Sequence, residues 1–138
     1  MRGVCLCGAV RIDVNAPVQE VSACHCDMCR RWSGAAMFAF GAPEDAVTVE
    51  GPVRSRASSP FAERTWCDAC GTHLWFRERG ADYELSAGLF DDARPFPLTR
   101  EVYADRAFAA CRLAGEHRRV TRAEYENDRP HVDQGDVR

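Results

Sequence analysis

The chain has 138 residues, 46% of them hydrophobic, and a formal net charge of −3. This length suits one domain, and the hydrophobic content is enough to bury a core. The negative charge provides no basic surface for phosphate groups, so we expect no nucleic-acid partner. The longest weakly polar run, Ala35 to Ala42, is far shorter than the roughly 20 apolar residues that span a bilayer, so we expect no membrane partner.

Short strands dominate the predicted secondary structure. Residues 9–14 alternate apolar and polar side chains, which is typical of a half-buried strand. Further strands are predicted, in chain order, at 18–23, 37–40, 47–50, 63–66, 74–76, 83–87 and 101–104. Helical periodicity indicates only two short helices, at 30–34 and 122–127. The sequence therefore predicts a single small, mainly β domain.

This domain is expected to span residues 1–126. Residues 127–138 have few apolar side chains and no periodic pattern, so we expect a flexible tail there. The first residues carry no apolar signal-peptide segment, which favours a cytoplasmic protein with reduced thiols. In that compartment, clustered cysteines are more often metal ligands than disulfides. The sequence does not point to one oligomeric state.

Seven of the eight cysteines fall into three clusters, and the first and third clusters are pairs. Cys5 and Cys7 are two residues apart, so on extended backbone both side chains point to one face. Cys67 and Cys70 have the two-residue spacer of a zinc knuckle. A single such pair also occurs in redox proteins, but the βαβ context of a thioredoxin-like motif is missing. Because each pair supplies half a tetrahedron, we predict that the two pairs together hold one structural zinc ion.

The middle cluster, Cys24, Cys26 and Cys29, offers three ligands within one short loop. His25 is a candidate fourth ligand, but alternation directs it away from its two neighbours. Cys111 lies alone in an apolar stretch, where a small core residue is the simpler interpretation. Structural zinc takes four protein ligands, whereas catalytic zinc typically keeps three and an exchangeable position. The middle cluster is therefore either a second structural site or an open, catalytic one.

The three clusters, with Gly8-Ala9-Val10 after the first and Gly71-Thr72 after the third, resemble the glutathione-dependent formaldehyde-activating enzyme family. Centromere protein V is among the relatives of this family. The resemblance covers roughly residues 3–106 and extends to Ser33-Gly34-Ala35 and Ala87-Gly88-Leu89-Phe90-Asp91-Asp92. It implies a β-tent of short antiparallel strands stapled by two Zn²⁺ ions per chain. By the same resemblance, Cys5, Cys7, Cys67 and Cys70 hold the structural zinc, and Cys24, Cys26 and Cys29 hold the catalytic zinc.

The family's named activity joins glutathione to formaldehyde and is classed as a carbon–sulfur lyase. The resemblance thus implies a zinc-dependent enzyme like S-(hydroxymethyl)glutathione synthase, which condenses glutathione or a similar small thiol with formaldehyde or another small electrophile. The alternative is a non-catalytic zinc scaffold or binding module with two structural metal sites. A departure from the family pattern is Glu101, where the family commonly carries a histidine.

Glutathione is acidic, so its carboxylates need donors. In the sequence, Arg30, Arg31, Arg54 and Arg56 are the nearest candidates. Two histidines are expected to have no role in the chemistry. His73 is predicted to pack or to form a hydrogen bond, and His117, in a charged stretch, is predicted to be solvated.

Overall fold

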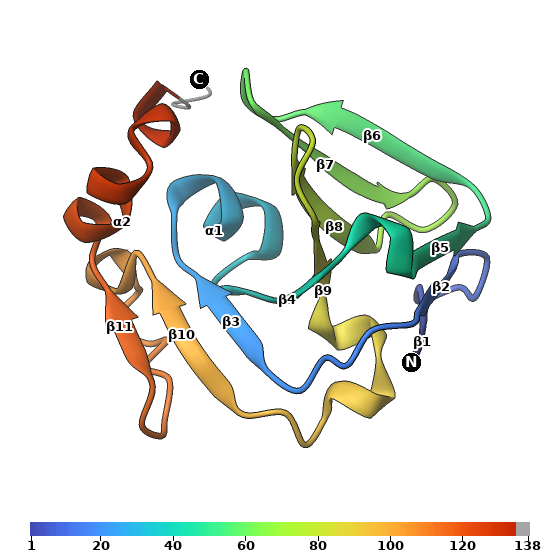
Figure 1. The fold of residues 1–138 in the computed structure, drawn as a ribbon, viewed down its shortest axis with the longest axis horizontal. Coiled ribbons are helices and arrows are strands. Elements are labelled where there is room, and N and C mark those ends of the chain that lie inside the picture. The colour runs from blue at the N-terminus through green and yellow to red at the C-terminus, as the bar shows by residue number, and fades with distance from the viewer. Residues whose placement is uncertain (135–138) are drawn as a thin grey trace.

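A computed structural model describes residues 1–134 of the chain. Within this range the strands form two sheets (Figure 1). The smaller sheet has the order β1-β2-β5, with bounds β1 (Arg2–Val4), β2 (Arg11–Val14) and β5 (Val47–Glu50). The larger sheet has the order β11-β10-β3-β4-β9-β8-β7-β6. Its strands are β3 (Val21–Cys24), β4 (Met37–Ala42), β6 (Val53–Ala57), β7 (Ala62–Cys67), β8 (His73–Glu78), β9 (Tyr83–Ser86), β10 (Leu98–Val102) and β11 (Arg118–Val120).

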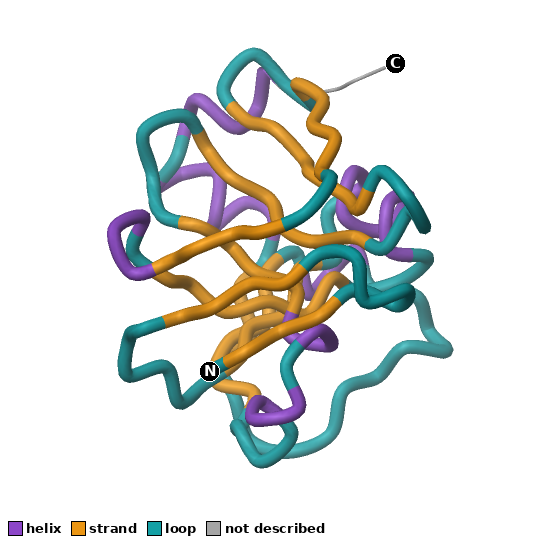
Figure 2. Tube along the Cα trace, turned by 90° about the vertical axis from the view of Figure 1, so that its right-hand side faces the viewer, coloured by secondary structure: helices purple, strands orange, loops and turns teal. Residues whose placement is uncertain are grey.

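Helices are short and connect or cover the strands, as the tube in Figure 2 shows. The two α-helices are α1 (Asp27–Ser33) and α2 (Arg122–Asp128) among the described residues. The 3-10 helices are η1 (Glu44–Ala46), η2 (Ala87–Leu89), η3 (Asp91–Ala93), η4 (Ala104–Arg106) and η5 (Pro130–Gln134). The prediction of a small, mainly β domain is confirmed. Most strand pairs are antiparallel, but β10 runs parallel to both β3 and β11.

Alternation along the strands gives the larger sheet two different faces. One face packs on the smaller sheet: Phe40 and Leu85 join Ile12 and Val14 in the main core. The opposite face carries Ser22 and other side chains that line the pocket described below. The main core therefore lies between the sheets, and the opposite face of the larger sheet carries two smaller buried clusters and the pocket.

Eight of the observed strands overlap the predicted ones, and β1, β6 and β11 were not predicted. Every residue of β6 is exposed, so this edge strand has no alternation of buried and solvated side chains to detect. β11 is short and consists of two arginines and Val120, which alone is buried. Its pairing with β10 is decided by tertiary contacts rather than by a local pattern.

The C-terminal boundary placed at residue 126 falls inside α2, which begins with a capping box between Thr121 and Glu124. The chain then continues into η5. Of the expected tail, residues 135–138 lie outside the described part of the chain. No helix within residues 1–134 is both long and apolar enough to cross a membrane.

Candidate functional site

The first and third cysteine clusters meet in space. Cys5 and Cys7 follow β1, Cys67 ends β7, and Cys70 lies in the turn that leads to β8. The four sulfur atoms all lie within 4.8 Å of one another. The Cys5–Cys7 and Cys7–Cys67 sulfur distances are 3.5 and 3.9 Å. Zinc–sulfur bonds of about 2.3 Å in a tetrahedron separate the sulfurs by about 3.8 Å, so this cluster fits zinc.

Local hydrogen bonds to the sulfur atoms of this four-thiol cluster favour the ionised, thiolate form. The backbone N–H of Val10 donates to Cys5 Sγ at 3.2 Å. The hydroxyl of Thr72 lies 3.1 Å from Cys70 Sγ and, with the Thr72 backbone N–H, lowers the pKa of Cys70 to about 6. Gly71 supports the tight turn after Cys70 with a φ of 75°, a region that glycine adopts without steric cost.

The middle cluster forms where β3 passes into α1. Cys24 ends β3, Cys26 precedes the helix as its N-cap, and Cys29 lies in the helix and is buried. The backbone N–H of Cys29 donates to Cys26 Sγ at 3.4 Å. The three sulfurs lie within 4.8 Å of one another, so they can hold one metal ion. His25 is not part of this group, as its alternating position suggested.

The three thiols of this cluster affect one another's ionisation. Hydrogen bonds from Cys24 and Cys29 lower the pKa of Cys26 to about 2. The bond to Cys24 favours the Cys29 thiolate, but the pKa of Cys29 is nevertheless raised to about 12 because Cys26 and burial oppose its ionisation. The pKa of Cys24 is also raised, by its hydrogen bonds with the other two thiols and by burial. One thiolate therefore forms readily, and a full set of three requires a cation, which fits a divalent metal ion.

Arg64 of β7 places a buried guanidinium beside this three-thiol cluster. Its Nη2 donates to Cys29 Sγ at 3.4 Å, and its Nη1 donates to Ser58 Oγ at 2.5 Å. The guanidinium carbon lies 5.4 and 4.9 Å from the ring centroids of Trp32 and Phe76. Arg64 is only 6% exposed, so its charge acts on the cluster with little screening by solvent.

Glu101 contacts His25, which lies between two cysteines of the three-thiol cluster, and also contacts His117 and Arg119 of the C-terminal segment. Its Oε1 lies 2.7 Å from His25 Nε2 and its Oε2 lies 2.7 Å from His117 Nε2. Arg119 Nε approaches Oε2 at 3.2 Å. The two histidine side chains and the glutamate side chain are at most 3% exposed. The prediction of a solvated His117 was therefore wrong, because the return of β11 beside β10 buries this side chain. His73, as predicted, packs: its ring stacks on Trp32 with centroids 4.3 Å apart.

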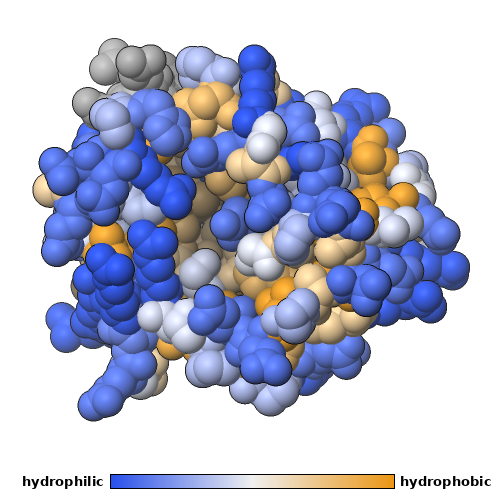
Figure 3. All heavy atoms as spheres, in the orientation of Figure 1, coloured by the Kyte–Doolittle hydropathy of each residue, from blue (hydrophilic) through white to orange (hydrophobic). Residues whose placement is uncertain are grey.

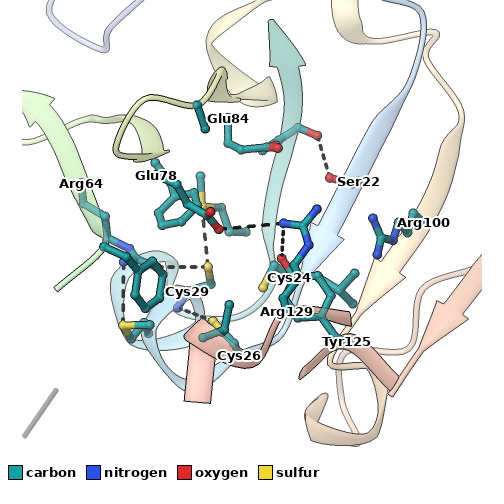
Figure 4. Close-up of a pocket in the computed structure, with 18 of the residues that line it drawn as sticks. Ser22, Cys24, Cys26, Cys29, Arg64, Glu78, Glu84, Arg100, Tyr125 and Arg129 are labelled. Atoms are coloured by element: carbon teal, nitrogen blue, oxygen red, sulfur yellow. Dashed lines mark hydrogen bonds and ion pairs between the residues drawn. The ribbon is translucent and has the colours of Figure 1, made fainter. Parts of the chain in front are cut away.

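A cavity of about 330 Å³ extends from the three-thiol cluster along the face of the larger sheet that is turned away from the smaller sheet. Cys24, Cys26 and Cys29 line it, whereas none of the four other clustered cysteines does. Figure 4 shows these sulfurs together with the charged side chains of the other walls. On the face shown in Figure 3, hydrophilic side chains surround a recess with a more apolar floor. The two clusters thus differ in their access to a pocket.

The pocket's arginines are not the ones that the sequence suggested. Arg30, Arg31, Arg54 and Arg56 do not line it. Arg54 of β6, for example, forms an ion pair with Asp68 at 2.8 Å. The lining arginines are Arg64 on β7, Arg100 on β10 and Arg129 after α2. No local pattern marks them, because the pairing of distant strands and the packing of α2 bring them together.

Two acidic side chains of the pocket, Glu78 of β8 and Glu84 of β9, were also missed. Glu78 is paired: it lies 3.9 Å from Arg129 Nη1 and 3.4 Å from His131 Nε2. Cys111 belongs to neither cluster and lies half-buried in the loop between η4 and β11.

Comparison with known proteins agrees with this arrangement. The family model described as glutathione-dependent formaldehyde-activating enzyme matches residues 1–106. A protein of Schizosaccharomyces pombe named as an uncharacterized lyase is 33% identical over 106 residues, which are 75% of this chain and 77% of that protein. A crystal structure of a Rhodobacter sphaeroides protein superposes with a TM-score of 0.58 at 25% identity, covering 72% of this chain and all of the other. With most of its length matched, the chain is a member of the glutathione-dependent formaldehyde-activating enzyme family.

Proposed function

We propose that this protein is a zinc-dependent enzyme of the carbon–sulfur lyase type. It joins glutathione, or a similar small thiol, to formaldehyde or another small electrophile. Cys24, Cys26 and Cys29 hold the catalytic zinc, and the four-thiol cluster holds a structural zinc. The family description names glutathione and formaldehyde, and the yeast relative is named a lyase; both support this assignment.

The observation that carries the proposal is the difference between the two clusters. The four-thiol cluster has the full ligand set of a structural zinc site and does not line the pocket. The three-thiol cluster has one ligand fewer and lies at the wall of a cavity of about 330 Å³. This volume is at the lower end of small-molecule sites, which run from about 300 to 1,000 Å³. A thiol that enters the cavity therefore reaches the cluster that can accept one more sulfur.

The reaction needs an ionised sulfur, an oriented carbonyl group and no oxidant. Zinc held by the three cysteines would supply a Lewis acid that lowers the pKa of a thiol bound to it. The Arg64 guanidinium offsets part of the negative charge of the cysteine sulfurs and orients Cys29 through its hydrogen bond. In the addition, the thiol sulfur forms a bond to the carbonyl carbon, the C=O π bond breaks, and the carbonyl oxygen takes up the proton that the thiol released. The apolar side chains Met37, Phe76 and Val102 of the pocket wall limit access of water to the reacting carbon.

All eight cysteines are free thiols, with no disulfide among them. Reduced thiols are expected in the cytoplasm, where glutathione is also found. We propose a cytoplasmic location, which these free thiols support.

Cobalt substitution tests the proposal, because cobalt absorption reports the ligands of the metal. We expect the wild-type protein to bind two metal ions, and glutathione to shift the absorption of one of them. Cys24→Ser should lower the metal count and abolish the glutathione response. Cys111→Ser, which changes a cysteine outside both clusters, is the matched control and should behave as wild type.

Exchange NMR of formaldehyde and glutathione then measures catalysis directly, as the rate of adduct formation above the uncatalysed rate. A cobalt spectrum that no thiol alters, together with an adduct rate equal to the background, contradicts the enzymatic assignment and supports the scaffold alternative.

A further inference from the structure

Arg100 and Glu84 carry opposite charges into the pocket without forming a pair. Both side chains line the cavity, Arg100 from β10 and Glu84 from β9. Within residues 1–134, neither forms an ion pair or a hydrogen bond. Figure 4 shows them on different walls, with Ser22 between them in that view. Three other charged side chains of the pocket have partners: the buried Arg64 contacts Cys29, and the partly exposed Glu78 contacts the exposed Arg129.

Arg100 and Glu84 are both only partly exposed, so their surroundings remove some of the water that would solvate these charges. Arg100 Nε is buried with no acceptor, and the guanidinium carbon lies 5.6 Å from the ring centroid of Tyr125. Burial raises the pKa of Glu84, although Arg129 and Arg100 partly oppose that shift. A buried polar or charged group without a partner costs free energy that a complementary ligand recovers. The pocket is therefore suited to a ligand that brings both an anionic and a cationic group.

Strand register places these charges at a distance from the cysteines. Arg100 is level with Ser22, two residues along β3 from Cys24. Glu84 is paired with Gly41, two residues beyond Ala39, which is itself level with Ser22. Each two-residue step along a strand is about 7 Å. A ligand whose sulfur lies at the cysteines must therefore carry its charged groups several bonds away from that sulfur.

We propose that Arg100 and Glu84 bind the α-amino-acid group of the thiol substrate, with its carboxylate on Arg100 and its ammonium group on Glu84. This inference rests on the proposed function and defines its substrate class as a thiol with a remote zwitterionic group. Glutathione has such a group at its γ-glutamyl end. A guanidinium binds a carboxylate through two parallel hydrogen bonds, which supplies both charge and orientation.

Another ligand of partly similar chemistry is a small carbonyl compound that bears a carboxylate. It would use Arg100 but not Glu84, whose ionised form repels an anion. A thiol with an α-amino-acid group would therefore need both Arg100 and Glu84, whereas a carbonyl compound with a carboxylate would need only Arg100. A short thiol such as free cysteine has the right charges but too little length between them and its sulfur.

The test measures apparent dissociation constants of thiols from the cobalt-loaded protein, for wild type, Arg100→Gln, Arg100→Lys and Glu84→Gln. The four thiols are glutathione, glutathione acetylated on its amino group, free cysteine and the uncharged 2-mercaptoethanol. We expect Arg100→Gln to weaken glutathione about 10- to 100-fold, as for the loss of a hydrogen bond between charged groups. Arg100→Lys should lose less, and neither variant should change 2-mercaptoethanol binding.

Glu84→Gln should weaken glutathione but not its acetylated form, because only the former presents an ammonium group. Arg54→Gln is the matched control, since Arg54 is exposed and pairs with Asp68 away from the pocket. Wild-type glutathione binding in both pocket variants overturns this inference, as does an equal loss for 2-mercaptoethanol. Free cysteine binding as tightly as glutathione also overturns it. If no thiol changes the wild-type spectrum, the proposed function fails together with the inference.

Discussion

Replacing Glu101 by alanine removes the carboxylate that His25, His117 and Arg119 share. In the wild-type structure both histidine side chains are buried, at 2% and 1% exposure. The His117 Nε2 loses its hydrogen-bond acceptor, and the His25 Nε2 loses the oxygen that lay 2.7 Å away. Because water has little access to either nitrogen in the wild-type structure, we expect neither contact to be fully replaced.

The size of the effect follows from burial. Removing one partner of a buried ionic network costs about 3–5 kcal/mol, because the remaining groups are left without compensation. Arg119 adds little to this sum, since its side chain is 58% exposed. We therefore expect Glu101→Ala to lower the free energy of unfolding by about 3–5 kcal/mol. Glu101→Gln keeps one oxygen acceptor but replaces the other carboxylate oxygen by an NH2 donor and removes the charge, so it should cost less than the alanine change, about 1–2 kcal/mol.

Urea unfolding of the metal-loaded protein, followed by circular dichroism, measures both values. The concentration of free zinc must be held constant, because bound metal stabilises the folded state by mass action. Glu20→Ala is the control: this exposed residue should change the stability by less than about 0.5 kcal/mol. If Glu101→Ala costs less than about 1 kcal/mol, close to that control, then the contacts of Glu101 with His25, His117 and Arg119 do not stabilise the fold as we expect.

Three further outcomes are expected. Cys67→Ser should abolish binding at the four-thiol cluster and unfold the domain at lower urea than Cys111→Ser does, because structural zinc contributes folding energy; metal analysis and urea titration measure this. Arg64→Met should weaken zinc at the three-thiol cluster by about 10-fold in competition with a chromophoric chelator, whereas Arg56→Met on the exposed strand β6 should not. Burial opposes the ionisation of Glu101, yet the His117 hydrogen bond and the nearby positive charges lower its pKa below the usual value of 4.5. The ionised Glu101 therefore contributes stability at neutral pH, and this contribution is lost as the pH falls through the folded-state pKa. Unfolding midpoints from pH 7 down should therefore fall more for wild type than for Glu101→Gln, and parallel curves would contradict this assignment.

Local sequence patterns determined much of this protein. The spacing of the cysteine pairs predicted which sulfurs come together, because a two-residue spacer or an extended dipeptide directs both side chains to one side. The same alternation predicted that His25 points away from Cys24 and Cys26. Strands with a buried face, such as β4 and β9, have apolar residues on that face, and this pattern predicted them from the sequence.

Only the tertiary structure decided what surrounds the three-thiol cluster. Arg64, Glu84 and Arg100 come from three different strands, and nothing within each strand marks them as neighbours. His117 has the sequence context of a solvated residue and is buried only because β11 returns beside β10. Periodicity along a strand reports which side of that strand is buried, whereas the charges that share a pocket depend on register between strands that are far apart in the chain. The metal-binding pattern is therefore local in the sequence, and the substrate pocket is a product of the assembled sheet.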